Sequence, residues 1–143
     1  QPWEFIVVTE EDTLDAMRAD AAGFGDYNAP IAIVVCGYNE FIPWDGDEGT
    51  VDCAAAIENM LIAATAMGLG SVWMGGFNRD TLRAILNIPD QVHPIGVVYF
   101  GHPAEQWEPR TKYVEDAVYW EAYDTSREHE PRPGNLASRV TGQ

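Results

Sequence analysis

Four short apolar segments alternate with stretches of helical character, and this alternation constrains the fold more than any other feature of the sequence. The segments lie at 3–8, 31–37, 71–74 and 94–100. Strand-sized apolar segments between helices are typical of proteins in which helices cover a sheet. We therefore expect an α/β sandwich with some parallel strand pairing. The segment 31–37 is apolar throughout, which predicts a central strand.

Three helices are predicted between these strands. Thr9 is suited to cap a short helix that carries Leu14 and Met17, and Asn78 is suited to cap a helix that runs to about Leu86. The longest helix, over 51–67, follows Thr50 as a capping residue and is rich in alanine. Because it is apolar on nearly every side, we expect it to be buried, with small side chains that allow close approach of another helix or a second subunit.

The end of the chain differs in composition from the rest. A loop over 104–112 leads to a predicted short helix over 113–123. From Asp124 onward the sequence is polar and contains Pro131, Pro133 and Gly134, which predicts a flexible tail over 124–143.

The charge of the chain limits its partners. Its 143 residues suit one domain, and the formal net charge is −15 with a single lysine. Such a surface repels phosphate backbones and anionic membranes, so we expect neither nucleic acid nor a membrane as partner. The sequence contains no apolar run of roughly 18–20 residues and no visible secretory signal, and we expect a cytoplasmic protein. The acidity has two open interpretations, an ordinary acidic protein or adaptation to a salty environment.

The residues that commonly bind metals or act as nucleophiles form no recognisable motif. Cys36 and Cys53 are too few and too far apart for a disulfide framework or a CxxC site, and Cys36 lies in a strand pattern typical of an inert buried thiol. His93, His102 and His129 lack the spacing of metal ligands. We expect no metal site and no side-chain catalytic constellation.

Glycines between 68 and 76 form the most informative local cluster. A dinucleotide-binding fingerprint would lead from strand to helix, whereas Gly68 and Gly70 lead from helix to strand. Gly75 and Gly76 do follow a strand and precede a capped helix, and adjacent glycines let a backbone lie close to a flat ligand. The local sequence leaves two interpretations open, a simple turn and a ligand-binding turn.

Two of the eight basic residues lie together after the last strand. Arg110 and Lys112 are two positions apart in an otherwise acidic chain. Their proximity indicates a bound anion, most simply a phosphate, while surface salt bridges to Glu108 or Glu115 are the alternative.

In their order along the chain, these features resemble the nitroreductase family. The resemblance covers about 1–123. It is carried by Gln1-Pro2-Trp3-Glu4-Phe5, Ala29-Pro30, the helix segment 56–64, Gly68-Leu69-Gly70-Ser71-Val72-Trp73, the strand 94–101, Pro103 and Arg110-x-Lys112-Tyr113.

The resemblance implies a fold and a cofactor. The family has a mixed α/β sheet flanked by helices and usually forms an intertwined homodimer with two FMN molecules at the interface. By resemblance, 1–123 is a partial FMN-binding domain. The resemblance places the flavin ring against the backbone of Trp73, Met74, Gly75 and Gly76, the FMN phosphate on Arg110 and Lys112, and the substrate entrance at Phe41 and Trp44.

The resemblance also implies a mechanism. NAD(P)H would deliver a hydride to flavin N5, and a second substrate, such as a nitroaromatic or a quinone, would then take the electrons by a ping-pong route. Two alternatives stay open. One is a specialised flavoenzyme of the same fold, such as a dehalogenase or a dehydrogenase. The other is a non-catalytic protein that binds flavin or another ligand.

The sequence departs from the family pattern at its start. Members carry a leading helix with an arginine-rich phosphate-binding motif, followed by a Pro-Ser-x-x-Asn loop, and both would precede Gln1. We therefore expect that the chain lacks its N-terminal segment and that it binds FMN poorly by itself, because charge-assisted contacts contribute about 1.5–3 kcal/mol each.

Overall fold

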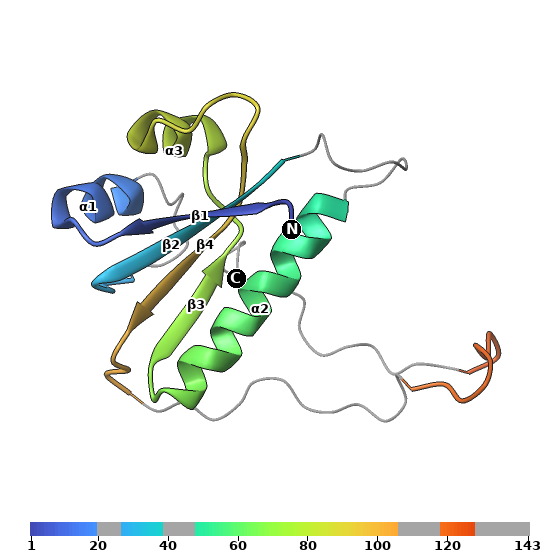
Figure 1. Cartoon of the computed structure of the whole chain (residues 1–143). Helices are drawn as coiled ribbons and strands as arrows, with labels where there is room; N and C mark the ends of the chain where they lie inside the picture. Colours follow the sequence, from blue (N-terminus) through green and yellow to red (C-terminus); the bar gives the residue numbers. More distant parts are fainter. Residues whose placement is uncertain (20–26, 39–47, 106–117, 128–143) are drawn as a thin grey trace, which may run out of the picture. The chain divides into compact units, whose positions relative to one another are not determined.

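The structure of the protein is a computed structural model that describes residues 1–19, 27–38, 48–105 and 118–127. It divides into two compact units, Gln1–Glu105 and Gln106–Gln143. In the first unit helices cover both faces of a sheet (Figure 1). Its described elements are β1 (Trp3–Val8), α1 (Glu11–Ala19), β2 (Ile31–Gly37), α2 (Glu48–Ala66), β3 (Gly70–Met74), α3 (Arg79–Leu86) and β4 (His93–Gly101).

The sheet has the strand order β1-β2-β4-β3, and every pairing among the described strands is antiparallel. The expected sheet with helices on its faces is confirmed, and β2 is central as predicted. The expected parallel pairing is not found. β2 and β3 do run in the same direction, since both are antiparallel to β4, but β4 lies between them. The helices α1 and α3 instead join neighbouring strands that run in opposite directions.

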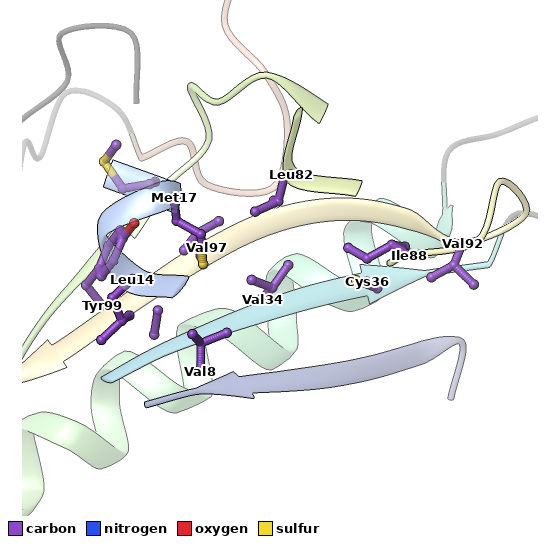
Figure 2. Close-up of a cluster of buried hydrophobic side chains, with 12 residues drawn as sticks. Val8, Leu14, Met17, Val34, Cys36, Leu82, Ile88, Val92, Val97 and Tyr99 are labelled. Atoms are coloured by element: carbon purple, nitrogen blue, oxygen red, sulfur yellow. The ribbon is translucent and has the colours of Figure 1, made fainter. Parts of the chain in front are cut away.

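Successive residues of the central strand pack on opposite faces of the sheet, as the two-residue period of a strand requires. Val34 and Cys36 belong to the apolar cluster that lies under α1 and α3 (Figure 2). Val35 packs with Cys53 and Ile57 of α2 on the other face. Burial on both faces explains why β2 is apolar without interruption.

A bulge interrupts the central β2–β4 pairing. Val35 lies opposite Gly96 and Cys36 lies opposite Pro94, so Ile95 is an additional residue in β4. Proline has no N–H to donate and is tolerated in a strand at such a position. The bulge places Gly96 on the α2 face of the sheet, opposite Val35.

The first helix is tied to the strand that follows it. The first backbone hydrogen bond of α1 runs from the Leu14 N–H to the Glu10 carbonyl at 3.0 Å. Glu10 therefore precedes the helix as its cap, one residue after the predicted cap Thr9. Near the end of the helix, the Arg18 guanidinium donates to the carbonyls of Tyr27 at 3.2 Å and Ala29 at 2.8 Å. Arg18 therefore has a structural role, since it links α1 to the segment before β2.

The long helix α2 differs from the prediction in two ways. It begins at Glu48, so Thr50 lies inside the helix and not at its cap. It is also not buried all round: Cys53 and Ile57 face the sheet, but Ile62 is 59% exposed. The sheet covers one side of the helix, and none of the described residues of the first unit covers the other. The helix ends at Ala66, and Gly68 follows with φ +75° as the predicted terminating glycine.

The second unit is described only over 118–127. No helix forms over 118–123, contrary to the prediction, and Glu121 has a φ of 62°, which an α-helix does not allow. The rings of Tyr119 and Tyr123 stack with centroids 4.2 Å apart, and the Arg127 guanidinium lies 4.6 Å from the Tyr119 ring. The Asp124 carboxylate accepts hydrogen bonds from the Ser126 backbone and hydroxyl, which lower the pKa of Asp124. The proposed boundary at 123 stays a prediction.

Alkaline pH is expected to destabilise the protein through Cys36. Burial, followed by the nearby Glu4 carboxylate, raises the pKa of this thiol from 9.0 to about 11. The folded state therefore holds the proton at a pH where the unfolded state releases it, and stability falls as the pH rises through this window. Urea unfolding at several pH values should show a steeper loss between 9 and 11 for the natural chain than for Cys36→Ala. Tyr99, whose pKa burial also raises, is common to both proteins, so equal slopes would contradict the assignment to Cys36.

Candidate functional site

The glycine turn Gly75-Gly76 connects the end of β3 to the start of α3. Asn78 caps α3, and its side-chain oxygen accepts from the backbone N–H groups of Asp80 at 3.0 Å and Thr81 at 3.2 Å. The cap satisfies two N–H groups at the start of the helix. Both glycines are exposed, so the capped helix fixes the far end of a turn whose backbone faces outward.

Space around Gly75 bears on the two interpretations of this turn. A Cβ atom added to Gly75 would meet no atom of the described residues within 4 Å, so packing against this part of the chain does not require glycine here. The residue also has no backbone conformation that demands glycine, since it is absent from the positive-φ positions. A flat ligand that lies against the backbone accounts for a glycine in such a place. The ligand-binding interpretation of the turn therefore stays open beside that of a simple turn.

Trp73 lies on the α2 face of the sheet, two residues before the turn. Its indole crosses the backbone of Gly96 in β4: a Cβ atom built on Gly96 would lie 2.5 Å from Trp73 Nε1. The same atom would lie 2.8 Å from Ile57 Cδ1 of α2. Trp73 is nevertheless 40% exposed. One edge of the ring thus packs against Gly96, and another part of the residue is exposed to solvent.

Met74 points to the opposite face of the sheet. Its side chain is buried in the cluster under α1 and α3 and lines a small cavity of about 10 Å³. This volume is close to the roughly 10–15 Å³ that one water molecule needs, so the cavity cannot hold a flavin. Only the backbone of Met74 is available to a ligand at the turn. The sequence pattern alone did not separate the roles of Trp73 and Met74.

Two further residues at this site were missed by sequence reasoning. Gly96 lies inside an apolar strand, and nothing local indicates that an indole from another strand occupies its side-chain space. Arg79 directly follows the capping residue, and its Nε donates to the Pro94 carbonyl at 3.3 Å. Its guanidinium lies 5.8 Å from the Phe77 ring centre, and it forms no ion pair with the carboxylates that the structure describes. Its place three residues after Gly76 was the available signal.

The other predicted site residues lie outside the described ranges. These are Arg110 and Lys112, predicted to bind phosphate, and Phe41 and Trp44, predicted to line the entrance. Within the described residues, no group of three metal-ligating side chains is arranged to hold a metal ion. Searched over the same residues, the helices include none with the length and apolarity of a membrane span.

Comparison with known proteins identifies the class to which this arrangement belongs. The nitroreductase family model matches residues 26–102. A protein of Archaeoglobus fulgidus named an NADH dehydrogenase/NAD(P)H nitroreductase is 36% identical over 132 residues, which cover 86% of this chain and 75% of that protein. An FMN reductase (NADPH) of Bacillus subtilis is 38% identical over 73 residues, covering 50% of this chain and 29% of that protein.

A solved structure agrees in fold. The crystal structure of an NADH dehydrogenase/NAD(P)H nitroreductase from Bacteroides thetaiotaomicron superposes with a TM-score of 0.73 at 34% identity. The match covers 85% of this chain and 73% of that one. The chain therefore belongs to the nitroreductase family. The relatives that establish this are named as oxidoreductases that use NADH or NADPH.

Removal of the α3 cap should destabilise the protein measurably. Asn78→Ala leaves two backbone N–H groups without their acceptor, and we expect the free energy of unfolding to fall by about 1 kcal/mol. Urea unfolding provides the measurement. Asn78→Asp keeps an acceptor oxygen and should lose much less, whereas an equal loss in both variants would show that the capping bonds do not stabilise the helix.

Proposed function

We propose that this chain is the flavin-binding part of an NAD(P)H-dependent FMN oxidoreductase. The observation that carries the proposal is the glycine turn after β3, where Gly75 leaves open space beside an exposed backbone. Membership of the nitroreductase family and the printed name of the Bacillus subtilis relative, an FMN reductase, support the same cofactor.

The turn would hold the reactive edge of the ring. When bound, FMN would supply the redox chemistry that links NAD(P)H to a second substrate, by the ping-pong route that the family resemblance implies. The backbone N–H groups of Gly75 and Gly76 would donate to the heteroatoms of that edge and favour its electron-rich state. Trp73 and the backbone of Met74 would form the rest of the protein surface that faces this edge of the ring. No side-chain acid or base is required of the chain.

The phosphate of FMN would lie on Arg110 and Lys112. Arginine matches phosphate with a fork of N–H donors, and lysine adds a mobile positive charge. In a chain of net charge −15, two adjacent cations suit a role in holding an anion.

The electron acceptor would be a small molecule such as a nitroaromatic or a quinone. Phe41 and Trp44 precede α2 and are proposed to line the entrance to the flavin, with the enzyme acting in the cytoplasm. A specialised flavoenzyme of the same fold, such as a dehalogenase or a dehydrogenase, would differ in the acceptor. A non-catalytic flavin-binding protein would bind FMN without turnover.

The exposed side of α2 supports a homodimer. Val51, Ile62 and Met67 are large apolar side chains that stay exposed in the single chain. Ala55 and Ala63 lie among them and are also exposed, and small residues let a second helix approach closely. A partner subunit on this side would bury the helix all round, as its composition predicts.

A titration with FMN tests the proposal. We expect the protein to bind FMN weakly, as the sequence predicts, and the bound yellow flavin to bleach when NADH or NADPH is added without oxygen. Gly75→Ala should weaken FMN binding roughly tenfold, equivalent to about 1.4 kcal/mol, because the added methyl group meets the ligand. The unfolding midpoint of the FMN-free variant should not fall, since that methyl meets no atom of the described residues within 4 Å.

Different outcomes of this titration separate the candidates. Binding without bleaching would favour the non-catalytic alternative. A chain that does not bind FMN would contradict the proposal. Equal affinity of Gly75→Ala and the natural chain would remove the turn from the flavin site.

The phosphate assignment has its own test. Arg110→Ala and Lys112→Ala should each weaken FMN binding by about 1.5–3 kcal/mol, or roughly ten- to hundredfold. Binding of riboflavin, which lacks the phosphate, should not change. Arg139→Ala removes an arginine outside the pair and serves as the matched control. An equal loss for FMN and riboflavin would contradict phosphate binding by this pair.

A further inference from the structure

The position of the Trp73 indole requires a glycine at residue 96 of β4. The β-bulge at Ile95 brings Gly96 onto the α2 face, opposite Val35. There the pyrrole edge of Trp73 lies over it, with Nε1 at 2.5 Å and Cδ1 at 3.1 Å from the position of an added Cβ atom. The separation from Nε1 is shorter than real Cβ atoms adopt, and the separation from Cδ1 is tighter than most of their contacts, so a larger residue must move the indole.

Ile57 lies on the other side of the space above Gly96, and we call the space between Gly96 and Ile57 the seat of the Trp73 indole. Its Cδ1 lies 2.8 Å from the same Cβ position, and the residue is fully buried in the cluster between α2 and the sheet. The indole is therefore held between a strand and a helix that are far apart in the sequence. A ring held in this way keeps one orientation although 40% of the residue is exposed.

We propose that Gly96 is a positioning residue for the flavin, acting through Trp73. The inference rests on the proposed function. By leaving its side-chain space empty, Gly96 lets the indole lie flat on the α2 face, two residues before the glycine turn. The exposed part of the indole then forms a fixed aromatic wall beside the turn, against which the flavin ring is held.

The nature of the short contacts indicates what a substitution would do. The atoms that face the added methyl belong to side chains, Trp73 and Ile57, and not to the backbone. Side chains can rotate, so Gly96→Ala is accommodated by displacing the indole while the sheet is kept. The substitution therefore changes the position of one ring next to the turn.

The test is a double-mutant cycle on the full chain with Gly96→Ala, Trp73→Phe and the double variant. FMN affinity and the visible spectrum of bound FMN are measured for each. We expect Gly96→Ala to weaken FMN binding roughly ten- to hundredfold, equivalent to about 1.4–2.8 kcal/mol, and to shift the spectrum of bound FMN, because the displaced indole alters the contact with the flavin ring. In the Trp73→Phe background the same substitution should have less than about a twofold effect, because coupled residues are not additive.

A second readout needs no flavin. The difference in fluorescence between the natural chain and Trp73→Phe is the emission of the Trp73 indole. Acrylamide quenching of this difference reports the exposure of that indole alone. Gly96→Ala should increase that quenching. Gly70→Ala is the matched control, because its added Cβ atom meets Pro103 at an ordinary 3.4 Å and leaves Trp73 untouched. If Gly96→Ala does not fold, Ile57→Val removes the Cδ1 atom from the seat and should change both readouts in the same direction.

The outcomes distinguish this inference from the function on which it rests. Failure of the natural chain to bind FMN overturns both. If FMN binds and Gly96→Ala has equal effects in both backgrounds, or no effect, the positioning role is wrong and the proposed function stands. Unchanged quenching in Gly96→Ala also overturns the positioning role, since the indole would not have moved.

Discussion

The antiparallel pairing of β2 with β4 is the constraint on which the rest of the described fold depends. Both strands are covered on two faces, by α1 and α3 on one side and by α2 on the other. Val34 and Val35 are fully buried, one on each face, so neither cluster can form without the other strand in register. The bulge at Ile95 then sets which face each residue of β4 presents, and it brings Gly96 under Trp73.

The candidate site is a consequence of this arrangement at the end of β3. The strand alternation sends Met74 into the core and Trp73 to the α2 face, so one anchors the strand while the other stays available to a ligand. The capped start of α3 then fixes the turn between them and the helix. A rigid strand and a capped helix hold an exposed glycine backbone, which is how a site gains precision without catalytic side chains.

Two arginines in the described part of this acidic chain donate hydrogen bonds that hold the first unit together. Arg18 ties α1 to the segment before β2, and Arg83 contacts His93 at 3.2 Å and the Pro89 carbonyl at 3.3 Å. These arginines bind the first unit together and are not available to an anion.

The sequence by itself determined the strands and helices of the first unit, the central place of β2, the Asn78 cap and the termination of α2 before Gly68, because periodicity, capping and positive φ are local properties. Its ordered motifs also indicated the family. Only the tertiary structure decided the antiparallel strand order, the exposed side of α2 and the opposite roles of Trp73 and Met74. The seat that Gly96 and Ile57 form for the Trp73 indole belongs to this second group. It joins a strand, a helix and a bulge far apart in the sequence, and no local pattern encodes which side chain fills the space above a glycine.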